Sequence, residues 1–148
     1  MKKILFVLGG LLALTVISIH AEETNQPPVR VAIIGLTHDH ARGFIPSILA
    51  QSDVQLAGIV ESDHALAARY AELYHLNTNL FYASLKDLLA KTNIQAVAIF
   101  TSTFDHRRVV EECAPLGLTI MMEKPLAVNL KDARAMAAAA KNIMSRSS

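Results

Sequence analysis

After residue 28 the chain alternates between two kinds of apolar pattern. Short runs rich in β-branched residues, typical of strands buried on both faces, fall at 29–34, 54–60, 80–82, 96–100 and 119–122. Apolar residues at helical spacing fall between them and after them, at 44–49, 63–73, 85–91, 107–116 and from 130 to about 141. Strands that alternate with helices predict βαβ units and a parallel sheet. Right-handed crossovers favour a doubly wound α/β fold with five strands in the order 3-2-1-4-5.

Polar residues and prolines indicate where the helices begin. Pro46 is acceptable in the first turn of a helix, so we expect the 44–49 helix to begin close to it. Ser62 or Asp63 can cap the second helix. Ser84 is followed three residues later by Asp87, the spacing of a capping box, which predicts the start of the third helix.

The N-terminal segment has the pattern of a secretory signal. Lys2 and Lys3 precede an apolar run that ends at Ala21. We expect a signal peptide over 1–21, a polar linker over 22–28, a single domain over 29–141 and a short tail over 142–148. The mature protein is then periplasmic or secreted and is not held at a membrane. A retained N-terminal anchor is the alternative interpretation.

Charge and cysteine content exclude some classes of function. The 148 residues have a formal net charge of +1, and loss of Lys2 and Lys3 makes the mature chain slightly acidic. No basic patch with interleaved aromatic residues is present, which argues against nucleic acid as a partner. Cys113 lies in an apolar helical pattern, so we expect a buried, unreactive thiol.

The loop after the first strand resembles a dinucleotide-binding turn. Gly35 ends the apolar run, and a helix follows whose N-terminus can bind an anion. The dinucleotide fingerprint has glycine at two later positions, where this chain has Thr37 and His40. We nevertheless expect Gly35, Leu36, Thr37 and His38 to contact a cofactor.

Polar residues also end the other strands, at the edge of the sheet where ligands bind in such folds. Glu61 ends the second strand, where a carboxylate accepts from ribose hydroxyls and repels a 2′-phosphate, so NAD is favoured over NADP. After the fourth strand, the cofactor-contacting candidates are Thr101, Ser102, Thr103 and His106. Capping or packing at the helix start is the competing interpretation of His106.

Glu123 and Lys124 end the fifth strand. Glu123 is a further candidate for cofactor contact, and the ammonium of Lys124 can hydrogen-bond a substrate hydroxyl or exchange a proton with it. A surface turn is the alternative interpretation of this segment.

The pair His38 and His40 also suggests a metal site. Side chains at this spacing in a loop do not by themselves form a preorganised site, so we expect no metal. The residues of this loop instead take the place of the missing glycines and narrow the loop around a pyrophosphate.

Three stretches of the chain resemble the Gfo/Idh/MocA family, the glucose–fructose oxidoreductase and inositol dehydrogenase group. They are the run 33–35, the run 96–100 with His106 after it, and the closing segment 117–127 with its Glu-Lys-Pro and a following Asn-capped, Ala-rich helix. The resemblance covers about residues 29–141 and the family's N-terminal NAD(P)-binding Rossmann domain.

The resemblance implies NAD(P)-dependent oxidoreduction of a sugar, cyclitol or related hydroxyl compound. It implies that Lys124 is the catalytic lysine and that Gly35 and Glu61 occupy cofactor-loop and ribose positions. Full-length family members continue into a substrate domain that also forms the homo-oligomer interface. This chain ends where a sixth strand is expected, so we expect a fragment without that domain and little or no turnover by this chain alone.

Three functional hypotheses follow from the sequence. The first is the cofactor domain of a dehydrogenase. The second is a nucleotide binder or inactive remnant, and the third is an interaction protein that retains only the scaffold.

Overall fold

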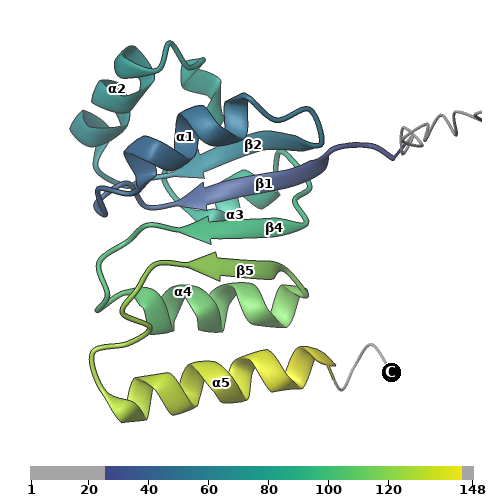
Figure 1. Cartoon of the computed structure of the whole chain (residues 1–148), viewed down its shortest axis with the longest axis vertical. Helices are drawn as coiled ribbons and strands as arrows, with labels where there is room; N and C mark the ends of the chain where they lie inside the picture. The colour runs from purple at the N-terminus through teal and green to yellow at the C-terminus, as the bar shows by residue number, and fades with distance from the viewer. Residues whose placement is uncertain (1–25, 145–148) are drawn as a thin grey trace, which may run out of the picture.

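The computed structural model describes residues 26–144, so the predicted signal segment lies outside the described part. Five parallel strands form one sheet in the order β3-β2-β1-β4-β5, which confirms the predicted doubly wound topology (Figure 1). The strands are β1 (Val29–Ile34), β2 (Val54–Val60), β3 (Phe81–Tyr82), β4 (Ala96–Ile99) and β5 (Thr119–Met122). All of their carboxyl ends therefore lie at one edge of the sheet.

The helices cover both faces of this sheet. They are α1 (Ala41–Leu49), α2 (His64–Leu73), α3 (Leu85–Leu89), α4 (His106–Cys113) and α5 (Leu130–Met144), with 3-10 turns η1 (Thr78–Leu80) and η2 (Ala114–Leu116). No helix in residues 26–144 has the length and apolar character needed to cross a bilayer.

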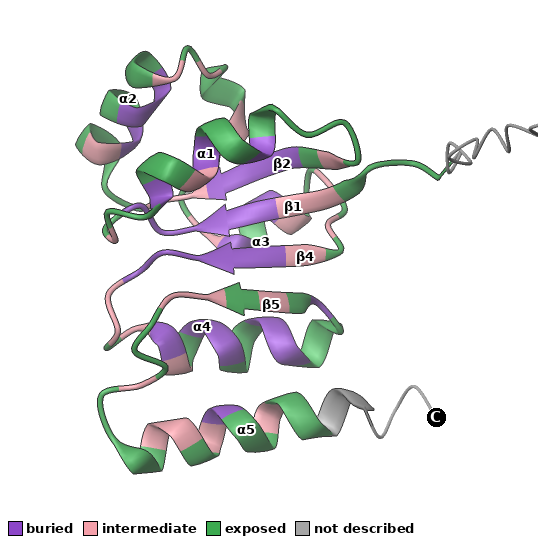
Figure 2. Ribbon diagram, viewed as in Figure 1, coloured by how far each residue is buried: buried purple, intermediate pink, exposed green. Residues whose placement is uncertain are grey.

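Two apolar clusters form the core because successive strand residues face opposite sides. Ile33 packs with Ile45 of α1 and Tyr70 of α2, whereas Ile34 packs with Leu88 of α3 and Val109 of α4. β1, β2 and β4 are buried through much of their length, whereas β5 lies at the border of the sheet and is partly exposed (Figure 2). Beyond β5, α5 packs against α4.

The start of α1 differs from the prediction. The helix begins at Ala41, three residues before the predicted position, so Pro46 lies in the helix interior and not in the first turn. Proline has no N–H, so the carbonyl of Arg42 cannot receive the usual i to i−4 hydrogen bond. The hydroxyl of Tyr74, at the end of α2, donates to this carbonyl at 2.9 Å. A side chain from a neighbouring helix thus replaces the hydrogen bond that Pro46 cannot make.

Two helix ends also differ from the prediction. The α-helical part of α4 ends at Cys113 and not at Leu116, because Pro115 cannot donate an N–H and the chain continues as the 3-10 turn η2. Gly117 then ends the turn at φ +72°, as a C-cap glycine does. At the C-terminus, α5 continues to Met144, three residues beyond the predicted end at 141.

The other predicted boundaries are close to those observed, and the capping residues are confirmed. The Asp63 side chain accepts from the N–H groups of Ala65 and Leu66, and Ser84 Oγ accepts from the N–H of Asp87. η1 occupies the predicted start of the third strand, and α3 ends at Leu89.

Candidate functional site

A cavity of about 380 Å³ opens at the carboxyl edge of the sheet. Its lining comes from the ends of β1, β2 and β3, from the loop after β4, from the start of α3 and from α4. The residues are Ile34, Gly35, Thr37, Val60, Glu61, Ser62, Ala83, Ser84, Leu85, Thr101, Asp105, Arg108 and Glu112. Four of the predicted cofactor residues, Gly35, Thr37, Glu61 and Thr101, therefore share one cavity.

Gly35 turns the chain from β1 into the loop, and only glycine fits there. Its φ is +80°, a backbone conformation that residues with a Cβ rarely adopt. A Cβ would lie 2.5 Å from Cγ2 of Thr101 and 3.0 Å from its Cα. The chain segments after β1 and β4 can approach this closely only because residue 35 has no side chain.

Glu61 binds the backbone of the same loop. Its Oε2 accepts from the N–H of Leu36 at 2.9 Å, and its Oε1 accepts from the N–H of Asp63 at 2.9 Å. Each carboxylate oxygen has a second acceptor position, so Glu61 can also accept from a ligand hydroxyl. One side chain therefore connects the end of β2 to the loop after β1 and faces the cavity.

Backbone hydrogen bonds hold the rest of this loop. The Gly35 N–H donates to the carbonyl of Val60 at 2.8 Å, and the His38 N–H donates to the carbonyl of Phe100 at 2.8 Å. Leu36 is buried between these two anchors. The loop is thus attached to β2 on one side and to the end of β4 on the other.

The loop after β4 forms another wall of the cavity. Ser102 Oγ donates to Asp105 Oδ2 at 2.7 Å, and the Asp105 carboxylate lies 3.5 Å from the Arg108 guanidinium. The sequence analysis did not select Asp105 or Arg108. Asp105 directly precedes the helix that follows β4, and Arg108 lies in its first turn. That position near the carboxyl end of a strand is the only feature of the sequence that could have identified them.

Several predicted cofactor residues lie outside the cavity lining. Leu36, His38, Ser102, Thr103, His106 and Glu123 are not among its walls. His106 is 1% exposed, and its Nδ1 lies 3.2 Å from the carbonyl oxygen of Leu126. His106 therefore packs the start of α4 against the segment after β5, and its Nε2 has no partner among the described residues.

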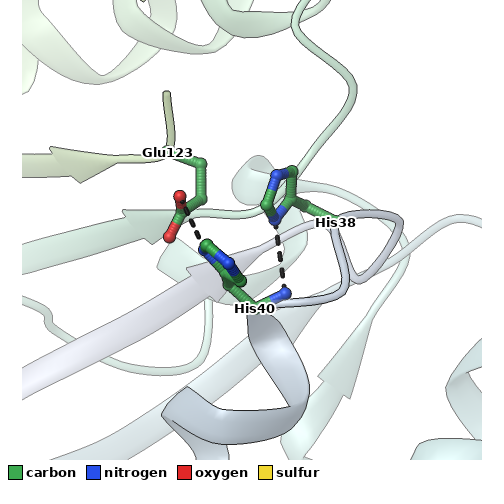
Figure 3. Close-up of side chains that lie close together, drawn as sticks. All are labelled: His38, His40 and Glu123. Carbon is green, nitrogen blue, oxygen red and sulfur yellow. Dashed lines mark hydrogen bonds and ion pairs between the residues drawn. The ribbon is translucent and has the colours of Figure 1, made fainter. Parts of the chain in front are cut away.

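His38, His40 and Glu123 gather beside the cavity, although the sequence separates Glu123 from the two histidines by more than eighty residues (Figure 3). His40 Nδ1 lies 2.9 Å from Glu123 Oε2, and the His40 N–H donates to Nδ1 of His38 at 3.3 Å. The two histidines alone do not form a preorganised site, but the fold adds a carboxylate to them.

Glu123 is ionised in this setting. Burial disfavours its charge, but hydrogen bonding and charge attraction from His40 and the backbone N–H of Lys124 outweigh burial and lower the pKa of Glu123. Lys124, the predicted catalytic residue, follows directly and is exposed at the same edge of the sheet. Lys124 and the cavity thus share the ligand-binding edge.

Known proteins resemble this chain over the same region. Residues 29–145 match the Gfo/Idh/MocA family, described as an oxidoreductase family with an NAD-binding Rossmann fold. An uncharacterised oxidoreductase of Synechocystis is 28% identical over 109 residues, which are 74% of this chain and 29% of that protein. The dTDP-3,4-didehydro-2,6-dideoxy-alpha-D-glucose 3-reductase of Streptomyces antibioticus is 26% identical over 79% of this chain and 35% of its own length.

A solved structure agrees with these matches. The WlbA dehydrogenase of Chromobacterium violaceum, in complex with NADH and UDP-GlcNAcA, has a TM-score of 0.70 and 26% identity, and the match covers 81% of this chain and 34% of that one. The chain spans about a third of the length of the curated relatives that it matches. It belongs to the Gfo/Idh/MocA oxidoreductase family and comprises that family's NAD-binding Rossmann domain.

Proposed function

We propose that this chain is the NAD-binding part of an oxidoreductase that transfers hydride between NAD and a sugar or a related hydroxyl compound. The observation that carries the proposal is the meeting of Gly35, Glu61 and Thr101 around one cavity, with Lys124 at the same edge of the sheet. The sugar-nucleotide substrates in the names of relatives support the substrate class.

Each residue has a role that follows from its position. Gly35 lets the backbone approach a pyrophosphate, and Glu61 accepts from a ribose hydroxyl while its charge disfavours a 2′-phosphate. Lys124 hydrogen-bonds the substrate hydroxyl and handles its proton. The cofactor supplies the hydride chemistry, and the protein orients the two reactants.

Filling the cavity tests cofactor binding. Ala83 is an exposed wall residue, so Ala83→Trp should occupy the cavity without disturbing the core. Calorimetric titration with NAD should show binding to the natural chain and a large loss of affinity in Ala83→Trp. Ala68→Trp, at an exposed position of α2, is the matched control. Equal NAD affinity in both variants would place the nucleotide elsewhere.

Turnover separates the dehydrogenase hypothesis from the nucleotide binder. NADH formation is followed with myo-inositol and UDP-GlcNAcA as trial substrates, in this chain and in this chain joined to a family-type C-terminal substrate domain. We expect little or no turnover by this chain alone. In the joined protein, Lys124→Ala should abolish turnover and leave NAD affinity unchanged, whereas Lys131→Ala, at an exposed position of α5, should change neither. A joined protein that binds NAD without turning over any hydroxyl substrate supports the binding-only alternative.

Export is a separate proposal that rests on residues 1–21. The basic start and the apolar run ending at Ala21 support cleavage near Glu22 and a periplasmic or secreted mature protein. N-terminal sequencing of the protein from the exported fraction tests this proposal, and an intact Met1 there would contradict it.

A further inference from the structure

We propose that His38, His40 and Glu123 form a binding site for one divalent first-row transition-metal ion, of which zinc fits best. Each residue offers one ligand atom, and these three atoms all lie within 4.8 Å of one another. The proposal concerns this cluster alone and does not depend on whether the chain binds NAD.

The distances suit a zinc ion. Bonds of about 2.0–2.2 Å in tetrahedral geometry place neighbouring ligand atoms about 3.3–3.6 Å apart. His40 Nδ1 and Glu123 Oε2 are 2.9 Å apart and need to separate only slightly. Every pair of ligand atoms lies within 4.8 Å, so side-chain rotations need to change these separations by no more than about 1.5 Å to place all three atoms around one ion.

The backbone beneath the ligands is already fixed. The His38 N–H donates to the carbonyl of Phe100, and the Glu123 N–H donates to the carbonyl of Ile99 at 3.4 Å. Ile99 and Phe100, which are consecutive at the end of β4, thus fix the distance between the backbones of His38 and Glu123. His40 lies directly before α1, which restrains the third ligand.

The donor set selects the class of metal. Imidazole nitrogens favour zinc, copper, iron and nickel, whereas magnesium and calcium prefer oxygen ligands throughout. Two imidazoles and one carboxylate leave a fourth position open, as in catalytic zinc sites. The side chain of His40 is 58% exposed and that of Glu123 is 18% exposed, so solvent or a ligand oxygen can reach that position.

Metal titration of the full chain, without an affinity tag and after treatment with a chelator, tests the proposal. We expect one equivalent of Co²⁺ to give a visible ligand-field absorption that one equivalent of Zn²⁺ removes. Zn²⁺ should also raise the thermal unfolding temperature, because the ion binds only the folded cluster.

Four variants decide whether the cluster is the site. Glu123→Gln, His38→Ala and His40→Ala should each weaken Zn²⁺ binding at least about 10-fold, since even the loss of an outer-sphere partner costs 10- to 100-fold. His64→Ala, which removes an exposed histidine of α2, is the control and should bind Zn²⁺ normally. Circular dichroism verifies that each variant is folded, and Glu123→Gln preserves the shape of the side chain.

Two results would overturn the proposal. One is the absence of a Co²⁺ spectrum in the natural chain. The other is Zn²⁺ binding that survives Glu123→Gln and His40→Ala or that is lost in His64→Ala. NAD binding is measured separately, so failure of the metal site leaves the proposed function intact.

Discussion

At the residue scale, individual atoms decide where the site can form. Gly35 has a left-handed φ and lies against Thr101, so the turn after β1 forms only because this residue has no Cβ. Glu61 holds the next residue of that loop through its side chain. Single substitutions at these positions therefore affect folding and binding together.

Gly35→Ala should destabilise the protein. The added Cβ meets Thr101 at 2.5 Å and the φ is positive, so we expect a loss of about 1–3 kcal/mol in the free energy of unfolding. Gly43→Ala in α1 is the control, because an added Cβ meets no atom of the described residues within 4 Å, and it should stabilise the helix by about 0.5–1 kcal/mol. Urea denaturation of both variants measures the two effects. A stable Gly35→Ala would contradict the described turn.

Glu61→Gln should narrow the preference for NAD over NADP. Loss of the negative charge removes repulsion of the 2′-phosphate and weakens the hydrogen bonds to ribose, an effect of about 1–3 kcal/mol. Parallel calorimetric titrations with both nucleotides give the ratio of dissociation constants. Glu72→Gln, on the exposed side of α2, should leave the ratio unchanged. An unchanged ratio in Glu61→Gln would mean that the carboxylate does not reach the ribose.

Cys113 should be unreactive in the folded chain. It is fully buried, and burial raises the pKa of its thiol to about 12, so almost no thiolate exists at neutral pH. An aromatic disulfide reagent at pH 8 should react only as fast as the protein unfolds, and quickly in guanidinium chloride. Fast reaction under native conditions would contradict the described packing.

At the scale of elements, contacts between helices compensate for local defects. Pro46 leaves the Arg42 carbonyl without its helical partner, and Tyr74 of the neighbouring segment donates to it. At the other end of the domain, Asn129 accepts from the N–H of Asp132 and caps α5, while Arg107 of α4 contacts the carboxylate of Asp132. A side chain from outside the helix therefore stabilises both α1 and α5.

Tyr74→Phe should cost about 0.5–1.5 kcal/mol in the free energy of unfolding, because the Arg42 carbonyl loses its donor. In a Pro46→Ala background the same substitution should cost close to nothing, since the alanine N–H can make the helical hydrogen bond. A double-mutant cycle in urea measures this coupling. Equal costs in both backgrounds would show that the hydroxyl does not replace the missing N–H.

The docking of α5 should weaken in acid. A hydrogen bond from Arg107, helped by Asn129 and opposed by burial, lowers the pKa of Asp132 below its ordinary 3.8. The carboxylate therefore stabilises the fold fully above about pH 4 and loses this effect as the pH falls through the lowered pKa. The stability difference between the natural chain and Asp132→Asn should shrink over that range. Asp53→Asn, an exposed carboxylate before β2, serves as the control.

At the scale of the whole molecule, the sheet is asymmetric. β1, β2 and β4 have long buried stretches, whereas β5 alternates between exposed and half-buried residues and, within residues 26–144, has a partner strand on one side only. Exposed apolar side chains continue beyond it at Leu126, Val128 and Leu130. An unprotected edge strand with apolar neighbours tends to pair with another chain.

Self-association should therefore occur through β5. Met121→Lys places a charge on this strand at a residue that is 43% exposed and should lower the fraction of dimers and larger species in sedimentation velocity. Leu73→Lys, at a comparably exposed position of α2, should not. Equal sedimentation of the two variants would exclude β5 as the contact.

The sequence predicted the topology because strand and helix periods differ strongly along this chain, and five clear strands leave few allowed orders. It misplaced the start of α1, because Ala41, Arg42 and Gly43 lack an apolar helical signal. It also missed the contact of Glu61 with Leu36 and that of His40 with Glu123. Residues so far apart in sequence meet only through strand order, which spacing within a loop does not reveal.

The anchoring of the loop after β1 has a consequence for the rate of ligand capture. The N–H groups of Gly35, Leu36 and His38 already have partners within the protein, so the entropy of ordering this loop is lost during folding and not when a ligand binds. A nucleotide should then associate in one kinetic phase whose rate rises linearly with its concentration, without a later isomerisation. The entropic cost of ordering the recognition loop is thus met when the domain folds and not when the nucleotide binds.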